Sequence, residues 1–265
     1  LEIPYESVDV RYGDTDFGLH AGSTAGSRQT AFSGNAVLRA IDVLIESACA
    51  ASEGRDCGKA GARELRPSGS PPTGADLFET ARAFAERGER LVGRSEFRSP
   101  PTCPAGCTDG TRVYFGYAYF SNFAVVSCDA VTGEARVEEL HSAYDIGRAI
   151  NRCKLEGQLE GGAMMGIGYA LNEEFHAEPC FRSIGLHDCG LPHMASLPAQ
   201  MTWKLIEHAD AHGPYGAKGL GEAPAVPVAP AVSNALYDAL GIRMWDLPAS
   251  PAKVKAALQA MCCCK

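Results

Sequence analysis

A bent loop that contains Glu222 is the segment whose residue types most directly suggest catalysis. Residues 213–224 contain four glycines and two prolines, and Glu222 precedes an apolar, proline-bounded segment. A carboxylate held among apolar groups has its pKa raised by desolvation, which makes it a competent general base near neutral pH. A glutamate before a helix can equally serve as a cap or dipole partner. The loop is not a P-loop, because glycine rather than Ser or Thr follows Lys218.

Two further segments carry residue types suited to binding. Residues 22–29 are rich in small and hydroxyl side chains, so backbone N–H groups can converge on an anion, and Arg28 adds positive charge. Gln158 opens a glycine-punctuated apolar stretch and offers both a donor and an acceptor, as recognition of a pterin-like edge would require. A flexible turn and a surface glutamine at a helix start are the simpler alternatives.

The length, composition and net charge of the chain disfavour several classes of protein. The chain has 265 residues, 46% of them hydrophobic, and a net charge of −8 from 24 basic and 32 acidic residues. This balance disfavours nucleic acid or an anionic membrane surface as the main partner. We see neither an apolar run long enough to span a bilayer nor a signal peptide. The opening Leu1-Glu2-Ile3-Pro4 suggests a fragment or processed piece, the alternative being a trimmed but complete protein.

The eleven cysteines favour reduced thiols over a disulfide framework, because the number is odd and no secretion signal is seen. Cys103 and Cys107 form a pair in a Pro/Gly loop, but no second pair at metal spacing follows. We therefore expect no protein-held metal. The run Cys262–Cys264 is expected to be a disordered, reactive tail.

Hydrophobic periodicity predicts strands and helices in mixed order, which is typical of an α+β fold with mixed sheets, hairpins and packed helices. Glycines in the apolar stretch 156–171 are best tolerated where another backbone or a ligand approaches closely. The expected elements are strands over 1–12, 113–120, 123–128 and 135–140, an extended segment over 190–205, and helices over 36–45, 75–87, 227–239 and 251–258.

Several motifs, in order along nearly the whole chain, resemble those of one enzyme family. The loop at 213–224 reads GPYGAKGLGEAP, and residues 156–171 read EGQLEGGAMMGIGYAL. These resemble the molybdenum-cofactor subunits of the xanthine dehydrogenase/aldehyde oxidase family, in their C-terminal part. The AGSRQ form at residues 25–29 is similar to the aldehyde oxidoreductase branch. Further matches are GDTD at 13–16, the hairpin VVSCDAVTGEARV at 125–137, DIGRAIN at 145–151 and GIRMWDLP at 241–248.

The resemblance implies a molybdenum-dependent oxidative hydroxylation of an aldehyde or N-heterocycle, with water as the oxygen source. In that family the metal carries a pterin dithiolene, an oxo group, a sulfido group and a hydroxide. The glutamate of the GAKGxGE loop, here Glu222, would take the hydroxide's proton. The oxygen would then attack the substrate carbon, and hydride would pass to the sulfido group. Electrons would leave through [2Fe-2S] clusters, and in many members through FAD.

The same resemblance assigns binding roles and partners. The cofactor would be molybdenum-molybdopterin in its cytosine dinucleotide form. The partners would be a small-molecule substrate, an iron–sulfur and an FAD domain or subunit, the remainder of the molybdenum subunit and a second copy in a cytoplasmic homodimer. Residues 1–111 would hold the cofactor-binding loop, a helix and an irregular excursion, and residues 112–265 the hairpin, glycine-rich helix and catalytic loop. The cofactor-binding residues would be Gly26, Ser27, Arg28, Gln29, Gln158 and Gly219.

Some positions depart from the family pattern. Arg152 stands where a proline is usual, and residues 188–193 replace a YxxPT-like segment, which leaves specificity open. The upstream QxFGG-type and GGGFGxK-type loops are not in this sequence. The alternative is a non-catalytic scaffold or binding relative of the same fold. A nucleotide-binding module would need a P-loop or Rossmann signature, and neither is found.

Overall fold

A computed structural model describes residues 3–16, 21–51, 74–104, 106, 113–178 and 181–263. The chain divides into two compact units. The first comprises residues 1–115 with 212–214, and the second comprises residues 116–211 with 215–265. Within the described residues, no helix combines the length and apolar character needed to cross a membrane.

The first unit is built on a long helix, α1 (Gln29–Ala51), which contacts α2 (Gly74–Glu86). Both predicted helices are confirmed, and α1 extends beyond the predicted 36–45 at both ends. Phe32 on α1 makes edge-on ring contacts with Phe97 and Phe115, each at a centroid distance of 5.5 Å. These contacts bring the segment that follows α2 back onto α1.

The predicted strand over residues 1–12 is wrong. The described part of this segment holds only a short 3-10 helix, η1 (Tyr5–Ser7), and residues 4–16 are exposed. Alternating apolar and polar residues form a stable strand only when a neighbouring strand pairs with their backbone. No such strand is found among the described residues of this chain.

The second unit contains a three-stranded sheet in the order β1-β2-β5. Strands β1 (Tyr119–Cys128) and β2 (Ala135–Asp145) form the predicted antiparallel hairpin, and β5 (Gln200–Ile206) pairs in parallel with β2. The predicted strand over 123–128 is part of β1, which begins at Tyr119 and has a register shift between Val125 and Val126. The strand predicted over 113–120 is wrong for residues 113–118, which are bends and irregular backbone. The segment expected to be extended over 190–205 is so only from Gln200, because a 3-10 turn, η3 (Met194–Ser196), precedes it.

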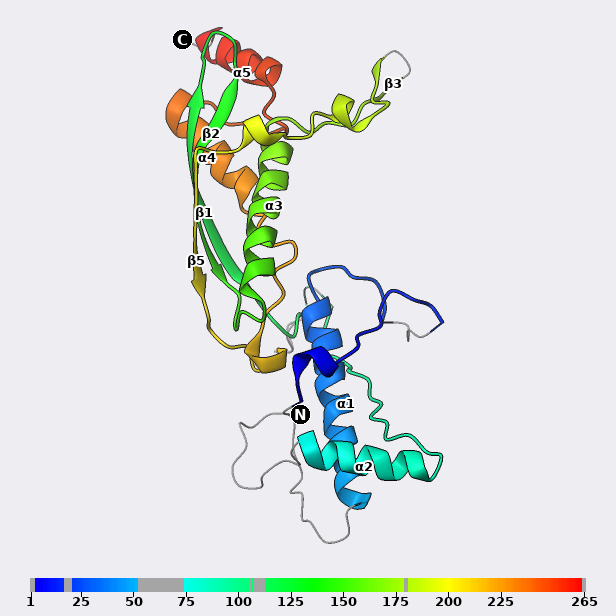
Figure 1. The fold of residues 1–265 in the computed structure, drawn as a ribbon. Coiled ribbons are helices and arrows are strands. Elements are labelled where there is room, and N and C mark those ends of the chain that lie inside the picture. The colour runs from blue at the N-terminus through cyan, green and yellow to red at the C-terminus, as the bar shows by residue number, and fades with distance from the viewer. Residues whose placement is uncertain are drawn as a thin grey trace. The chain divides into compact units, whose positions relative to one another are not determined.

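Helices α3 (Arg152–Leu171) and α4 (Val228–Leu240) pack beside each other on this sheet (Figure 1). The side chain of Asn151 caps α3 by accepting a hydrogen bond from the Lys154 N–H at 3.0 Å. Gly241 ends α4 in the left-handed conformation, as predicted. The core they enclose consists of Ala124, Val137, Leu140, Ala163, Ile167, Ala170, Leu171, Val228, Ala229, Val232, Leu236, Ile242, Ala249 and Val254. The expected α+β fold is confirmed.

The last helix, α5 (Pro251–Cys263), begins at Pro251 as predicted but continues beyond the predicted end. Cys262 and Cys263 are therefore helical rather than part of a disordered tail, because the helix that packs through Val254 on the core carries them. Cys49 on α1 is disulfide-bonded, which departs from the expectation of reduced thiols.

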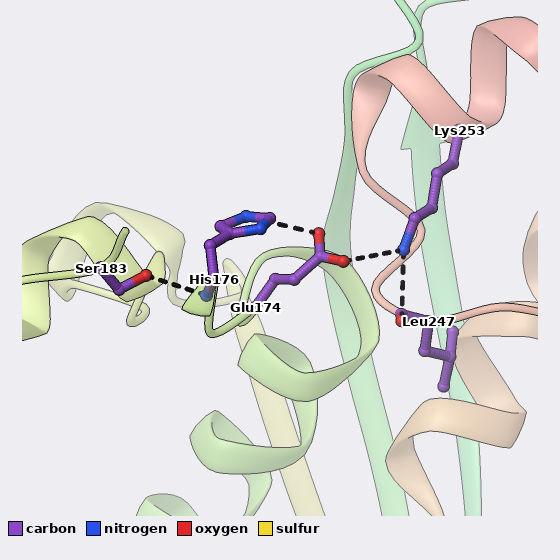
Figure 2. Close-up of polar contacts among 5 residues, drawn as sticks. All are labelled: Glu174, His176, Ser183, Leu247 and Lys253. Carbon is purple, nitrogen blue, oxygen red and sulfur yellow. Dashed lines mark hydrogen bonds and ion pairs between the residues drawn. The ribbon is translucent and has the colours of Figure 1, made fainter. Parts of the chain in front are cut away.

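The segment between α3 and β5 contains β3 (Ala177–Glu178), β4 (Phe181–Arg182) and a 3-10 turn, η2 (Leu186–Cys189). Figure 2 shows how its beginning is tied to α5. The Glu174 carboxylate lies 3.4 Å from Lys253 Nζ and 3.9 Å from His176 Nε2. The Lys253 ammonium also donates to the Leu247 carbonyl at 3.3 Å. These contacts are half-exposed, so each contributes modestly to stability.

Two glycines of α3 allow the chain before α4 to approach the helix. A Cβ at Gly162 would lie 2.6 Å from Pro224 Cβ, and a Cβ at Gly166 would lie 2.6 Å from Val228 Cβ and 2.7 Å from the Ala225 oxygen. Both contacts are too short for a real side chain. The prediction of close approach at these glycines is therefore confirmed.

Gly166→Ala should destabilise the protein by about 1–3 kcal/mol, because the new methyl group overpacks the contact with Val228. Gly161→Ala on the same helix is the matched control, since a Cβ there meets nothing within 4 Å. That change should stabilise by about 0.5–1 kcal/mol through helix propensity. Chemical denaturation measures both, and equal effects would contradict the packing described for α3.

Candidate active site

The loop that carries Glu222 begins with a sharp reversal at η4 (Pro214–Gly216). Tyr215 has a positive φ of 54° and Gly216 one of 83°. The Gly216 carbonyl accepts hydrogen bonds from the N–H groups of Arg148 and Asp210, at 3.1 and 3.0 Å. The reversal therefore places the loop directly beside the residues that follow β2.

A buried ion pair joins this loop to the end of β2. Lys218 Nζ lies 2.6 Å from Asp145 Oδ2, and the two side chains are only 6% and 10% exposed. The Lys218 N–H also donates to the Ile146 carbonyl at 2.9 Å, and Gly147 forms a bridge with Ala217. The second oxygen of Asp145 accepts from the Gly147 N–H at 3.3 Å.

The pKa of Asp145 reflects the balance of these contacts. Desolvation by burial, the largest single effect, raises it. The hydrogen bonds from Lys218 and Gly147 and the charges of Lys218 and His208 act together in the opposite direction. The net result is a pKa below the ordinary value of 3.8, so the carboxylate is ionised at neutral pH.

Gly147 is required for this approach. Its φ is +59°, a conformation that favours glycine, and a Cβ there would lie 2.0 Å from the Gly216 oxygen. Any side chain at this position would push the loop away from β2.

The part of the loop next to Glu222 is fixed by packing on both sides. Leu220 and Ala223 are buried in a small core with Tyr144, Ile146 and Leu159. Glu222 itself is exposed. The apolar enclosure expected around its carboxylate is therefore not provided by the described residues of this chain, because Leu220 and Ala223 are buried while Glu222 is exposed.

The capping alternative for Glu222 is excluded by the position of α4. This helix begins at Val228 with Pro227 as its N-cap, and its first turn contains no acidic residue. The intervening residues form turns, including a hydrogen bond from the Ala225 N–H to the Glu222 carbonyl at 3.1 Å. The Glu222 side chain is thus not a cap of α4.

Gln158 lies against the same loop. Its Nε2 donates to the Gly221 carbonyl at 2.6 Å, one residue before Glu222. Gln158 is exposed and sits on α3, four residues before Gly162, so both residues lie on the helix face that contacts residues 221–224. Gly219 is half-buried between Lys218 and Leu220. In the second unit, Gln158 on α3 therefore contacts the loop that carries Gly219 and Glu222.

The other predicted binding residues lie in the first unit, at the start of α1. Gly26 and Ser27 both have positive φ, 62° and 56°. Arg28 Nε donates to the Ser23 carbonyl at 3.0 Å, and its guanidinium lies 5.3 Å from the centre of the Phe32 ring. Gln29 Nε2 donates to the Ser33 hydroxyl. Gln29 Oε1 is buried and has no hydrogen-bond partner among the described residues.

No cluster of three or more His, Cys, Asp or Glu side chains suited to a metal ion is found in the part of the chain that the structure describes. Cys103 is buried, and Cys107 lies outside the described residues. The proposed Cys pair is thus not tested.

Comparison with known protein families identifies the family of this chain. The family model for the molybdopterin cofactor-binding domain matches residues 1–198. The chain belongs to this family. The resemblance seen in its motifs is therefore confirmed, although the Glu222 loop lies beyond the residues that the model matches.

Relatives cover that loop as well. An aldehyde oxidoreductase from Megalodesulfovibrio gigas is 29% identical over 260 residues, and the nicotine 6-hydroxylase large subunit from Paenarthrobacter nicotinovorans is 29% identical over 276. Both alignments take in 98% of this chain but only 26% and 32% of the relative. The chain thus spans about a quarter to a third of the length of these relatives.

A solved structure supports the same fold. The aldehyde oxidoreductase from Desulfovibrio desulfuricans superposes with a TM-score of 0.71 at 28% identity, over 89% of this chain and 23% of that one. The fold of this molybdopterin cofactor-binding chain therefore corresponds to one part of that aldehyde oxidoreductase.

Sequence reasoning missed the residues that hold the loop. Asp145 and Lys218 both stand in recognised motifs, but nothing in the spacing paired them. The available signal was that each is a charged residue inside an otherwise small and apolar motif. Charges in such settings are seldom buried without a partner.

The stability that Asp145 contributes should depend on pH. Because its pKa is lowered on folding, the contribution is complete above 3.8 and is lost as pH falls toward the lowered folded value. The unfolding temperatures of the wild type and of Asp145→Asn should therefore differ most near neutral pH and converge below about pH 4. Thermal melts from pH 7 to pH 2 measure this, and a constant difference would contradict the ion pair.

Proposed function

We propose that this chain supplies the catalytic base and part of the cofactor pocket of a molybdenum-dependent hydroxylase. The reaction would be oxidative hydroxylation of an aldehyde or N-heterocycle with water as the oxygen source. The observation that carries the proposal is Glu222: an exposed residue on a loop held by the buried Leu220 and Ala223, in a chain of the molybdopterin cofactor-binding family. The names of two relatives, an aldehyde oxidoreductase and a nicotine 6-hydroxylase, support the reaction class.

The donors and acceptors on this chain fit a pterin with an anionic tail. The buried Oε1 of Gln29 lacks a donor among the described residues, and a pterin or nucleotide edge offers N–H groups. Arg28 supplies positive charge for a phosphate. Gly26, Ser27, Arg28 and Gln29 would hold the phosphate and nucleotide tail, and Gln158 and Gly219 the pterin. When bound, the molybdenum cofactor supplies a Lewis acid and an acceptor for the substrate's electrons.

Glu222 would act as the general base. The residue is exposed, and its carboxylate would accept the proton of the water that provides the new oxygen of the product. The Gly221 carbonyl is fixed by Gln158, and Ala223 is buried. The carboxylate is therefore held on a backbone that is anchored on both sides. We infer that the rest of the protein closes over Glu222 and gives it the apolar surroundings that this chain does not.

The remaining assignments belong to the same proposal. Residues 1–111 would provide the nucleotide-side loop and residues 112–265 the catalytic loop. The nucleotide would be cytosine, electrons would pass to [2Fe-2S] clusters and FAD on other domains or subunits, and the assembly would be a homodimer in the cytoplasm. One relative is named as a large subunit, which supports a partner chain.

Glu222→Gln in the complete enzyme should leave the molybdenum content unchanged and lower turnover by about 10²–10⁴-fold, the range that a positioned general base contributes. Steady-state kinetics with elemental analysis of the same preparation measures both. Glu160→Gln, at an exposed glutamate of α3, is the control and should retain wild-type turnover. Full turnover in Glu222→Gln, or a preparation that never contains molybdenum, would favour the non-catalytic scaffold.

A further inference from the structure

We propose that the buried Asp145–Lys218 ion pair is the positioning device for Glu222. In this role the pair fixes where the Glu222 carboxylate lies and does not itself touch the reacting atoms. The inference rests on the proposed function of Glu222 as base. It concerns Asp145 and Lys218, which are distinct from the catalytic and cofactor-binding residues named above.

The loop requires such a device because of its composition. Between the reversal at Gly216 and the buried Ala223, glycines at 219 and 221 leave the backbone with many accessible conformations. Lys218 stands four residues before Glu222, on the one side of the loop that lies against β2. A fixed Lys218 therefore adds a restraint four residues before Glu222 to those that the buried Leu220 and the Gly221 carbonyl provide.

Asp145 provides a rigid attachment point for Lys218. It is the last residue of β2, the central strand of the sheet, where it lies opposite Tyr119 of β1 and Ile206 of β5. The Ile146 N–H continues this pairing by donating to the Ile206 carbonyl at 3.1 Å. The ion pair therefore ties the loop that carries Glu222 to the sheet and not to another loop.

Stability alone does not account for a buried pair. Removing two charges from water costs nearly as much as their attraction returns, and apolar residues of similar size often stabilise a fold as well or better. What the pair adds is a restraint: a contact of 2.6 Å that holds the Lys218 side chain to the end of β2. Position, rather than net stability, is therefore the property that the pair supplies.

The test uses the complete enzyme with four variants. Lys218→Met and Asp145→Asn each leave one buried group without its partner, and the double variant Asp145→Asn/Lys218→Met removes both charges. Arg152→Gln is the matched control, because Arg152 and Glu207 form a pair of similar length, 2.7 Å, that is exposed to 71% and 38%. Molybdenum content, unfolding temperature, kcat and KM are measured for each.

The expected results distinguish an effect on the position of Glu222 from an effect on the stability of the fold. Both single variants should unfold at lower temperature and lose about 100-fold in kcat, as a misplaced catalytic group does, with KM and molybdenum content retained. The double variant should regain most of the unfolding temperature, because no uncompensated charge remains, while kcat stays low. Arg152→Gln should match the wild type. Hydrogen exchange of the amides of residues 216–223 should accelerate in the double variant, a readout that does not depend on activity.

Two results would overturn the proposal: kcat that recovers together with stability in the double variant, or single variants that keep wild-type kcat. Glu222→Gln, measured in parallel, distinguishes failure of the positioning role from failure of the proposed function. If Glu222→Gln is inactive while the ion-pair variants turn over normally, only the positioning role is lost. If Glu222→Gln is fully active, the base assignment itself is wrong.

Discussion

The contact between Lys218 and Asp145 joins two segments that are 73 residues apart in the chain. It closes the connection between the end of β2 and the loop that carries Glu222. Without it, the backbone bonds at Gly216 and the small core around Tyr144 would still bring the loop near the sheet. They would not by themselves select one conformation of a segment so rich in glycine. The ion pair and Gly147, which lets the two backbones meet, therefore act together with these contacts to fix where the loop lies.

Helix α3 provides a second surface that holds the loop in place. Gln158, Gly162 and Gly166 recur at every fourth position, so they share one face of the helix. The absence of side chains at the two glycines admits Pro224 and Val228, and Gln158 adds a hydrogen bond to Gly221. One face of one helix thus supports the chain on both sides of Glu222, while the Lys218–Asp145 ion pair ties the preceding part of the loop to β2.

The sequence predicted best what depends on local interactions. The stop of α4 at Gly241, the start of α5 at Pro251 and the hairpin of β1 and β2 each follow from residues within a few positions of one another. The strand expected over 1–12 was wrong because a strand depends on a partner that the described chain does not contain. The order of the motifs along the chain identified the family. No single motif identified it on its own.

Within the site, the sequence indicated which residues matter but not how they meet. The Asp145–Lys218 pair and the Gln158–Gly221 bond are contacts between distant segments, and no periodicity encodes them. The expected apolar surroundings of Glu222 were inferred from its neighbours along the chain, and the structure shows those neighbours facing the opposite way. The chain turns tightly here, with hydrogen bonds from the Ala223 N–H to the Leu220 carbonyl and from the Ala225 N–H to the Glu222 carbonyl.

The most direct test of the central claim is a crystal structure of the complete protein with anomalous scattering recorded at the molybdenum edge. The account predicts one molybdenum peak in front of the Glu222 carboxylate, with the pterin next to Gln158 and the phosphate next to Arg28. A molybdenum peak remote from Glu222, or a cofactor that contacts none of these residues, would contradict it.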